Sequence, residues 1–232
     1  SDLLNENNIN SSEIKMIIHG TTLATNAIIE RKGAKTCFIT TEGFRDVLDI
    51  GYESRFDQYD ILIEKTMSLV PRKHRYVIEE RTDINGSQIK PINTTQFKKL
   101  IEKIKSENFE SIGIGFLHSY ANSENENILK EFIFNNLPGV EVSISSEVCP
   151  EIREYERFTT TVINAYIKPL MSNYLKKLEY ELIEKGFNCP LLLMTSGGTL
   201  TNIPSACNNP VRLVESGPAG GAILATSIAK DL

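Results

Sequence analysis

The sequence predicts an α/β fold in which short buried strands alternate with amphipathic helices. Segments of strand length, rich in β-branched and aromatic residues, recur along the chain. Most are followed by a segment whose apolar residues recur at helical spacing. This alternation favours a mostly parallel or mixed sheet with helices packed on it. With 232 residues and 41% hydrophobic content, the chain can bury a substantial core, as one large domain or two unequal ones.

The first part of the chain contains most of the expected elements. Strands are expected at 16–18, 36–41, 76–81, 88–92, 111–117 and 140–145, and helices at 24–32, from Thr94 or Thr95, and from Ser123. The dipeptide Asn85-Gly86 predicts a two-residue hairpin turn, so residues 52–92 are expected to form a β-rich excursion from the main sheet. Glycines alternate with large residues at 113 and 115, which predicts that another backbone lies close to this strand.

The second part is expected to begin with a long helical region, 147–187. Val162, Ile163, Tyr166 and Leu170 belong to its apolar stripe, and Pro169 should kink or divide it. Beyond it, strands are expected at 191–194 and 211–214 and a helix at 222–230.

Composition excludes several classes of function. The net charge is −5, with 25 Lys and Arg against 30 Asp and Glu, and no basic run stands out, which argues against nucleic acid as a partner. No apolar stretch approaches the length of a membrane span, which argues against a membrane. The four cysteines form no CxxC pair, so a reduced, cytoplasmic compartment is expected. The three histidines have no ligand-spaced partner, so a His-based zinc site is not expected.

Three turns rich in small residues are the candidates for chemistry. In the first, the strand ending at Ile18 enters His19-Gly20-Thr21-Thr22 and then a helix, so backbone N–H groups and hydroxyls converge where an anion or a polarised carbonyl could bind. The second follows Met194 as Thr195-Ser196-Gly197-Gly198. The third, Ser216-Gly217-Pro218-Ala219-Gly220-Gly221, stands at a helix start. Ordinary strand-to-helix connections would have the same pattern, and neither of the last two turns has Walker or dinucleotide-binding spacing.

Taken together, these motifs resemble the hydantoinase A / 5-oxoprolinase family, which includes the acetone carboxylase β subunit. The resemblance runs from Ile17 to Gly221 in the family's order. It rests on the following segments: 19–22, 24–27, 30–34, 41–46, 150–157, 164–166, 194–198 and 216–221.

The resemblance implies a ribonuclease-H-like lobe of the actin / sugar kinase / heat-shock chaperone superfamily, with a mixed sheet, flanking helices and the β-rich insertion at about 52–92. Residues 1–145 would be most of the N-terminal lobe, 146–187 a connecting helical region, and 188–232 the start of a second lobe. The family's Asp-x-Gly-Gly-Thr phosphate turns do not occur in the sequence. The chain is therefore expected to be an incomplete piece that does not hydrolyse ATP by itself.

The chemistry implied for the intact protein is ATP-dependent opening of a cyclic amide, such as hydantoin or 5-oxoproline, through phosphorylation of the carbonyl oxygen. ATP and Mg²⁺ are the implied cofactors. The implied partners are the cyclic amide and a hydantoinase B-type subunit or fused domain, and a homo-oligomer stays open.

Roles follow from residue type and family match. Catalytic roles are expected for Thr21, Thr22, Glu154 and Arg157, and substrate binding for His19, Gly20, Asn26 and Arg31. Nucleotide or phosphate binding is expected for Ser196, Gly197, Gly198, Ser216, Gly217, Gly220 and Gly221.

Each role has a structural alternative. The threonines could cap a helix, Arg31 could be solvated, and Glu154 and Arg157 could form a structural pair. Other functions stay open as well: a carbonyl-activating carboxylase subunit, a small-molecule kinase of the same superfamily, and a non-catalytic partner subunit.

Overall fold

The computed structural model describes residues 10–52, 57, 59–63 and 66–231. They form two compact units, a central one of residues 34–166 and a second one made of the segments before and after it. The second unit takes residues from both segments because the first strand of the chain pairs with the strand that begins at Leu191. The domain boundaries expected at 145 and 187 stay a prediction. The polar, asparagine-rich residues 2–13 are expected from sequence to form the end of a helix or a loop, and most of them lie outside the described residues.

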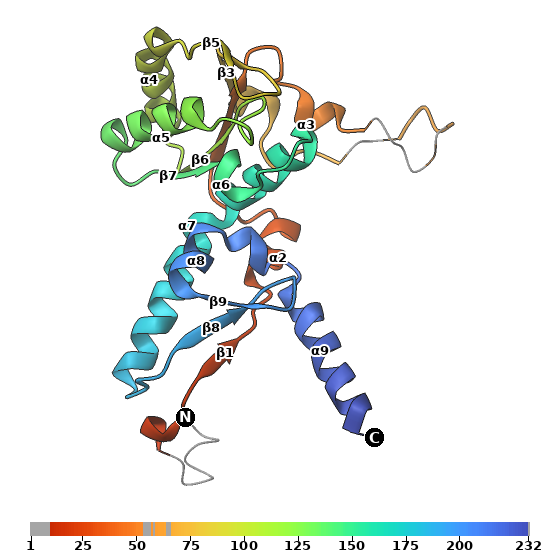
Figure 1. The fold of residues 1–232 in the computed structure, drawn as a ribbon, viewed down its shortest axis with the longest axis vertical. Coiled ribbons are helices and arrows are strands. Elements are labelled where there is room, and N and C mark those ends of the chain that lie inside the picture. Colours follow the sequence, from red (N-terminus) through yellow and green to blue (C-terminus); the bar gives the residue numbers. More distant parts are fainter. Residues whose placement is uncertain (1–9, 53–56, 58, 64–65, 232) are drawn as a thin grey trace. The chain divides into compact units, whose positions relative to one another are not determined.

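The central unit is built on a sheet of four parallel strands in the order β3-β2-β6-β7 (Figure 1). The strands are β2 (Thr36–Thr41), β3 (Arg75–Ile78), β6 (Ser111–Gly115) and β7 (Glu141–Ile144). The helices are α3 (Val47–Ile50), α4 (Phe97–Glu107), α5 (Glu124–Asn136), α6 (Ser145–Val148) and the start of α7 (Glu154–Glu184), with short 3-10 segments η2 (Arg72–His74) and η3 (Thr94–Gln96). Every residue of the inner strands β2 and β6 is buried, as a parallel sheet covered on both faces requires.

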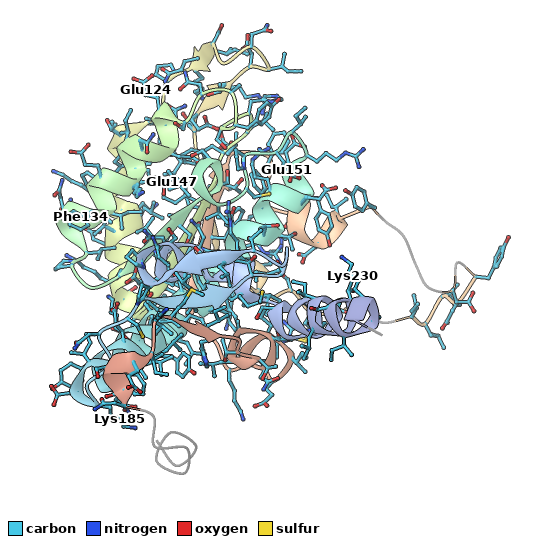
Figure 2. The ribbon with its side chains drawn as sticks, turned by 60° about the horizontal axis from the view of Figure 1, so that its bottom comes forward. Glu124, Phe134, Glu147, Glu151, Lys185 and Lys230 are labelled. Atoms are coloured by element: carbon cyan, nitrogen blue, oxygen red, sulfur yellow. The ribbon has the colours of Figure 1, made fainter. Side chains whose placement is uncertain are left out.

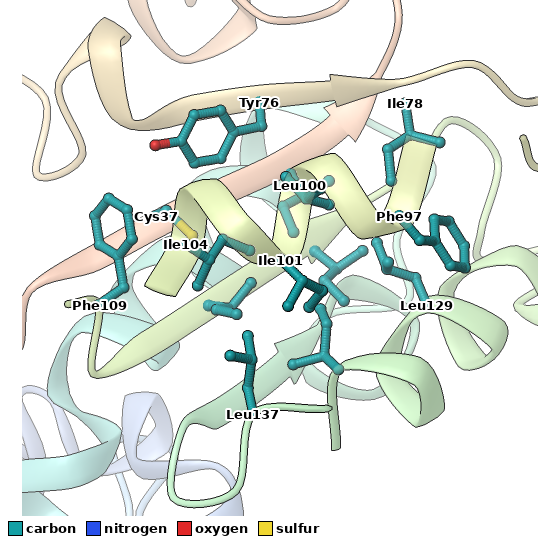
Figure 3. Close-up of a cluster of buried hydrophobic side chains, with 14 of the residues drawn as sticks. Cys37, Tyr76, Ile78, Phe97, Leu100, Ile101, Ile104, Phe109, Leu129 and Leu137 are labelled. Carbon is teal, nitrogen blue, oxygen red and sulfur yellow. The ribbon is translucent and has the colours of Figure 1, made fainter. Parts of the chain in front are cut away.

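Helices α4 and α5 bury their apolar faces in the main core, which Figure 3 shows. On α4, four apolar residues recur at helical spacing, which predicts that they share one face, and all four are buried: Phe97, Leu100, Ile101 and Ile104. On α5, Leu129 and Ile133 are fully buried, but Ile128 is 36% exposed. The cap expected at Thr94 or Thr95 is Asn93, whose side chain accepts a hydrogen bond from the N–H of Thr95 at 3.2 Å.

Among the described residues of 52–92, the β-rich excursion is smaller than predicted. The expected strand 76–81 is divided, and its first part, β3, joins the main sheet beside β2. Only β4 (Arg81–Thr82) and β5 (Gln88–Lys90) form the antiparallel hairpin. Asn85-Gly86 lies in its loop, but the loop spans residues 83–87 and is not the two-residue turn that was predicted. Gly86 has φ +84°, a conformation that favours glycine.

The glycines of β6 face aromatic rings and not another backbone. A Cβ at Gly115 would lie 2.5 Å from Cδ1 of Phe158 and 2.8 Å from Cζ of Phe38. These two rings pack against each other at a centroid distance of 5.3 Å. Gly115 is therefore required by ring packing between the sheet and α7.

The second unit contains a three-stranded sheet in the order β1-β8-β9 (Figure 1). Its strands are β1 (Ile17–His19), β8 (Leu191–Met194) and β9 (Leu200–Asn202). The other elements are η1 (Ser11–Glu13), α2 (Leu23–Ile29), α8 (Ile203–Asn208), η4 (Pro210–Leu213), α9 (Ser216–Asp231) and the later part of α7. Strands β1 and β8 are parallel, and β8 and β9 form an antiparallel hairpin.

Two predictions for this unit were wrong. The expected strand 211–214 is largely the 3-10 segment η4, because Pro210 has no N–H and suits the first position of a helix. The helix expected at 222–230 begins six residues earlier, at Ser216.

Helix α7 belongs to both units. It runs continuously from Glu154 to Glu184, so Pro169 does not divide it.

Exposed apolar residues are found on both units. On α5, Phe134 is 78% exposed, and Figure 2 shows it on the outer side of the helix. On α9, Ile223, Leu224 and Ile228 are each about half exposed or more. In the described part of the chain, no helix combines the length and apolarity needed to cross a bilayer.

Candidate functional site

Two of the three predicted turns follow neighbouring strands in the second unit. Strand β1 pairs with β8 so that His19 lies opposite Leu193. Because the strands are parallel, the turn after His19 and the turn after Met194 leave the same end of the sheet. This is the end of an α/β sheet at which ligands usually bind.

The third turn is joined to the first by two hydrogen bonds. The N–H of Glu215 donates to Oγ1 of Thr25 at 3.1 Å, and Oγ of Ser216 donates to the carbonyl of Thr21 at 3.3 Å. A Cβ at Gly217 would lie 3.7 Å from Cγ2 of Thr22. The start of α9 therefore lies directly against the Thr21–Thr22 turn.

The start of α9 leaves N–H groups that suit an anion. Because the helix begins at Ser216, the N–H groups of Ser216 and Gly217 precede its first internal hydrogen bond, and Pro218 has no N–H. The N–H groups of Gly220 and Gly221 lie further inside the helix and bond within it, so they are less suited to the phosphate contact that remains predicted for them. The residues at this helix start fit a phosphate group.

The turn after β8 fits a phosphate less well than predicted. It is the turn of the β8–β9 hairpin, and its N–H groups are mostly used internally. The N–H of Thr195 donates to the carbonyl of Thr199 at 2.9 Å, that of Ser196 to Arg212 at 2.8 Å, and that of Gly198 to Thr195 at 3.0 Å. Of the three predicted residues, only Gly197 has an N–H with no backbone acceptor among the described residues.

The two threonines of the first turn differ in their surroundings. Oγ1 of Thr21 accepts a hydrogen bond from the N–H of Leu23 at 3.1 Å. This is a local role at the start of the helix, as in the structural alternative that the threonines cap a helix. Thr22 is exposed, and its side chain makes no cap hydrogen bond. The amide of Asn26 reaches Oγ1 of Thr22 at 3.5 Å, and a Cβ at Gly20 would meet nothing within 4 Å. Thr22 and Asn26 therefore offer hydroxyl and amide groups beside open space.

His19 and Arg31 lie at the ends of this region. Nε2 of His19 and the hydroxyl of Tyr174 lie 2.8 Å apart, and burial lowers the pKa of His19 below its ordinary value. The imidazole is therefore mainly neutral near pH 7 and held in place by Tyr174. Arg31 follows α2 with φ 56°, an uncommon conformation for a non-glycine residue, and it is exposed.

The other two predicted catalytic residues belong to the central unit. Glu154, the first residue of α7, lines a pocket of about 280 Å³ bounded by α3 and the start of α7. Its carboxylate makes no hydrogen bond and no ion pair with any described residue. The Glu154–Arg157 ion pair considered as a structural alternative is therefore not formed.

Arg157 is fully buried and bonds to backbone carbonyls. Its Nη1 donates to the carbonyls of Glu151 at 2.5 Å and Ile152 at 3.2 Å, and its Nη2 donates to that of Phe116 at 3.1 Å. Burial lowers its pKa, and the negative charges of Glu126 and Glu154 oppose that shift. Arg157 therefore ties the start of α7 to the end of β6, which fits a positioning role. The charge-offsetting role expected from sequence stays a prediction.

No group of three or more His, Cys, Asp or Glu in the described part of the chain is arranged to hold a metal ion.

Sequence reasoning missed three features of these sites. Thr25 was quoted only as part of a motif, although it bonds Glu215, and nothing in the sequence relates Tyr174 to His19, 155 positions away. The pocket beside Glu154 was also missed, because its walls come from two segments about a hundred residues apart.

Comparisons with known proteins agree with the resemblance. Residues 1–137 match the model of the hydantoinase/oxoprolinase N-terminal region, and residues 157–232 match the hydantoinase/oxoprolinase model. An uncharacterised protein of Methanocaldococcus jannaschii is 44% identical over 97% of this chain and 33% of its own length. Caprolactamase subunit alpha of Pseudomonas jessenii is 32% identical over 90% of this chain and 30% of its own length.

Solved structures agree as well. The crystal structure of ATP-dependent caprolactamase from Pseudomonas jessenii superposes with a TM-score of 0.84 over 90% of this chain and 30% of that one. The nucleotide-free structure of acetone carboxylase gives 0.80 at 26% identity, over 92% of this chain and 31% of that one. The chain thus spans about a third of the length of the curated relatives it matches. It is a mixed α/β member of the hydantoinase/oxoprolinase family.

Proposed function

We propose that the protein to which this chain belongs opens a cyclic amide in a reaction driven by ATP. The observation that carries the proposal is the junction of the Thr21–Thr22 turn with the start of α9, where free N–H groups, a hydroxyl and an amide lie together. Such a junction fits an anionic phosphate beside a polar reacting group. The family includes ATP-dependent caprolactamase, whose substrate class is a cyclic amide.

The chemistry explains why ATP is needed. An unstrained lactam or hydantoin carbonyl is a poor electrophile, because the ring nitrogen donates electron density into it. Phosphorylation converts the carbonyl oxygen into a leaving group, after which water can attack the carbon. The work of the protein is then mainly positioning and stabilisation of charge.

The residues of the junction take the following roles in this proposal. The N–H groups of Ser216 and Gly217 hold a phosphate, and Thr22 and Asn26 bind the reacting group beside Gly20. Thr21, Thr25 and Tyr174 hold the junction and His19 in place, and Gly197 offers the free N–H of the hairpin turn. Arg31, exposed at the end of α2, is kept as a candidate for binding an acidic substituent of the substrate.

The proposal also covers the fold of the chain and the assembly of the whole protein. We place the chain in a ribonuclease-H-like lobe of the actin and sugar kinase superfamily, acting with a hydantoinase B-type subunit or fused domain. Mg²⁺ would enter with ATP. A relative named as a subunit, caprolactamase subunit alpha, supports a requirement for a second polypeptide.

Phosphate release from ATP and Mg²⁺ by the full-length protein tests the proposal. It should be measured with and without its partner subunit, against 5-oxoproline, hydantoin, N-methylhydantoin, ε-caprolactam and acetone. Stimulation by one cyclic amide, with ring-opened product in proportion, is the expected result. A stable phosphorylated product would favour a small-molecule kinase of the same superfamily instead. No stimulation by any amide would overturn the proposal.

Activation of a ketone for carboxylation is the second candidate. The superposition on acetone carboxylase favours it. Stimulation by acetone together with bicarbonate, and by none of the cyclic amides, would identify this activity in the same experiment.

A further inference from the structure

The pocket in the central unit combines aromatic walls with an open carboxylate. Its volume is about 280 Å³, near the lower end of the range for ligand pockets. Its lining comes from residues 44, 47 and 50–52, in and around α3, and from residues 153–156 at the start of α7. All of them belong to the central unit, so the pocket is a site within one unit.

Two tyrosines form the free aromatic surface of the pocket. The rings of Tyr52 and Tyr155 meet edge to face at a centroid distance of 5.2 Å, and Tyr52 is 57% exposed, so part of this surface is open to solvent. The third ring, Phe44, already has the guanidinium of Arg81 over it at 5.0 Å. The face of an aromatic ring is negative and attracts a cation, so the two tyrosine rings can take a second one.

The charged residues of the pocket give it a net negative charge. Oε1 of Glu156 lies 3.7 Å from Nη1 of Arg153, but the side chain of Arg153 is 75% exposed, so solvent screens this pair. Oε2 of Glu156 is enclosed by protein atoms and has no hydrogen-bond donor among the described residues. Glu154 is partly exposed, and no described residue hydrogen-bonds to its carboxylate. Glu154 is therefore the open acceptor of the pocket, and Glu156 adds a second negative charge to its walls.

We infer that this pocket binds a guanidinium group. A guanidinium is a flat cation that stacks on aromatic rings and donates two parallel hydrogen bonds to a carboxylate, so it matches the tyrosine rings and Glu154 together. The helix dipole favours a carboxylate at a helix start, so Glu154 alone would not indicate a ligand. The cavity and the aromatic surface are the independent observations.

This inference does not rest on the proposed function, because it concerns binding in the central unit alone. The catalytic role expected for Glu154 from sequence stays a prediction. Two sources can supply the guanidinium: a free small molecule, or an arginine side chain of a partner polypeptide. Their chemistry at the pocket is the same.

Helix α7 contains an internal control for the pocket. The tripeptide Glu154-Tyr155-Glu156 recurs near the end of the same helix as Glu179-Tyr180-Glu181. There Glu179 and Tyr180 are exposed, and Glu181 pairs with Lys177 at 3.8 Å. Identical substitutions in the two tripeptides change the same residue types on the same helix, with and without a pocket.

The first experiment compares three probes that share a butyl stem and differ in the head group. N-butylguanidinium has a charge and N–H donors, N-butylurea has the donors without the charge, and butyltrimethylammonium has the charge without the donors. Ligand-observed NMR of the full-length protein measures a dissociation constant for each. N-butylguanidinium should bind about 10-fold more tightly than the other two. Equal affinity for N-butylguanidinium and either of the others, or no binding of N-butylguanidinium, would overturn the inference.

The second experiment measures the same probe with variants of the two tripeptides. Glu154→Gln keeps the size of the side chain and removes its charge, so it should weaken N-butylguanidinium binding about 10-fold, and Glu179→Gln should leave it unchanged. Tyr155→Ala should also weaken binding, whereas Tyr155→Phe keeps the ring and should not. Wild-type affinity in Glu154→Gln, or equal losses in Glu154→Gln and Glu179→Gln, would overturn the inference. Circular dichroism identifies any loss in Tyr155→Ala that is caused by misfolding.

The peptide acetyl-Gly-Arg-Gly-amide distinguishes the two sources, because it presents the same head group on a polypeptide backbone. If the peptide displaces N-butylguanidinium at an equal or lower concentration, the source is an arginine side chain of a partner. If the pocket excludes the peptide and still binds N-butylguanidinium, the source is a free small molecule. Both results support a guanidinium site.

Discussion

The backbone N–H of Glu215 donates a hydrogen bond to Oγ1 of Thr25 at 3.1 Å, although 190 positions separate the two residues. The bond lies at the junction of the first turn and α9, where Ser216 also bonds to Thr21. Glu215 has φ 62°, so the backbone is already in an uncommon conformation where the bond forms. The side chain of Thr25 thus helps to hold the start of α9 in place.

Replacing Thr25 by Val removes the acceptor and keeps the shape of the side chain. We expect a loss of about 1 kcal/mol of stability, measured as a lower midpoint of thermal unfolding. Thr25→Ser restores the hydroxyl and should recover most of the loss. Equal midpoints for Thr25→Val and Thr25→Ser would show that the bond contributes nothing.

Arg157→Met should destabilise the central unit by about 3 kcal/mol or more. The change leaves the carbonyls of Glu151, Ile152 and Phe116 without their donor in a buried region. Urea unfolding of the full-length protein measures this, with exposed Arg153→Met as the control. A wild-type midpoint for Arg157→Met would contradict the positioning role and leave only the charge-offsetting role expected from sequence.

Gly115→Ala tests the ring packing against β6. A Cβ there lies closer to Phe158 and Phe38 than atoms can approach, so we expect a loss of about 1–3 kcal/mol from overpacking. Gly113→Ala should cost less, because its closest contact would be 3.2 Å. Combining Gly115→Ala with Phe158→Leu should restore part of the stability. If the double variant is simply the sum of the two losses, the clash is not the cause.

The buried carboxyl of Glu80 predicts a pH dependence of stability. Glu80 is 3% exposed, accepts hydrogen bonds from Thr41 and from Nδ2 of Asn125, and burial raises its pKa above the ordinary value of 4.5. The unfolded chain therefore loses this proton at lower pH than the folded one does, so the contribution of Glu80 to stability falls as pH rises from 4.5 through the raised pKa.

The measurement is the difference in unfolding midpoint between wild type and Glu80→Gln, which does not titrate. Relative to the variant, wild type should be most stable in acid and lose stability toward neutral pH. A difference that is constant with pH would contradict the assignment.

Local pattern predicted most helices and strands, because burial on one face leaves a period in the sequence. The apolar residues of α4 recur at helical spacing and are all buried as expected. The strand prediction for 211–214 was wrong because four apolar or long residues after a proline suit a strand or a helix start equally well. The apolar pattern also fails to place Ile128, because an apolar residue beside a buried one can still lie at the helix surface.

The sites were less predictable than the fold, because they depend on contacts between distant segments. The charges of Glu154 and Arg157 were visible in the sequence, but only the structure shows that one is partly exposed at a pocket and the other is enclosed among carbonyls. From sequence, the hairpin turn after β8 resembles a phosphate-binding turn. In the structure, most of its N–H groups donate to the backbone carbonyls of Thr195, Thr199 and Arg212.

The pairing of β1 with β8 has a consequence for synthesis on the ribosome. Strand β1 emerges early, but its partner at Leu191 is made only after the whole central unit. At typical translation speeds the delay is on the order of ten seconds. The central unit can fold in that time, while the first segment waits unpaired with the apolar residues Ile17 and Ile18 available to chaperones. Folding in the cell should therefore proceed from the middle of this chain outward.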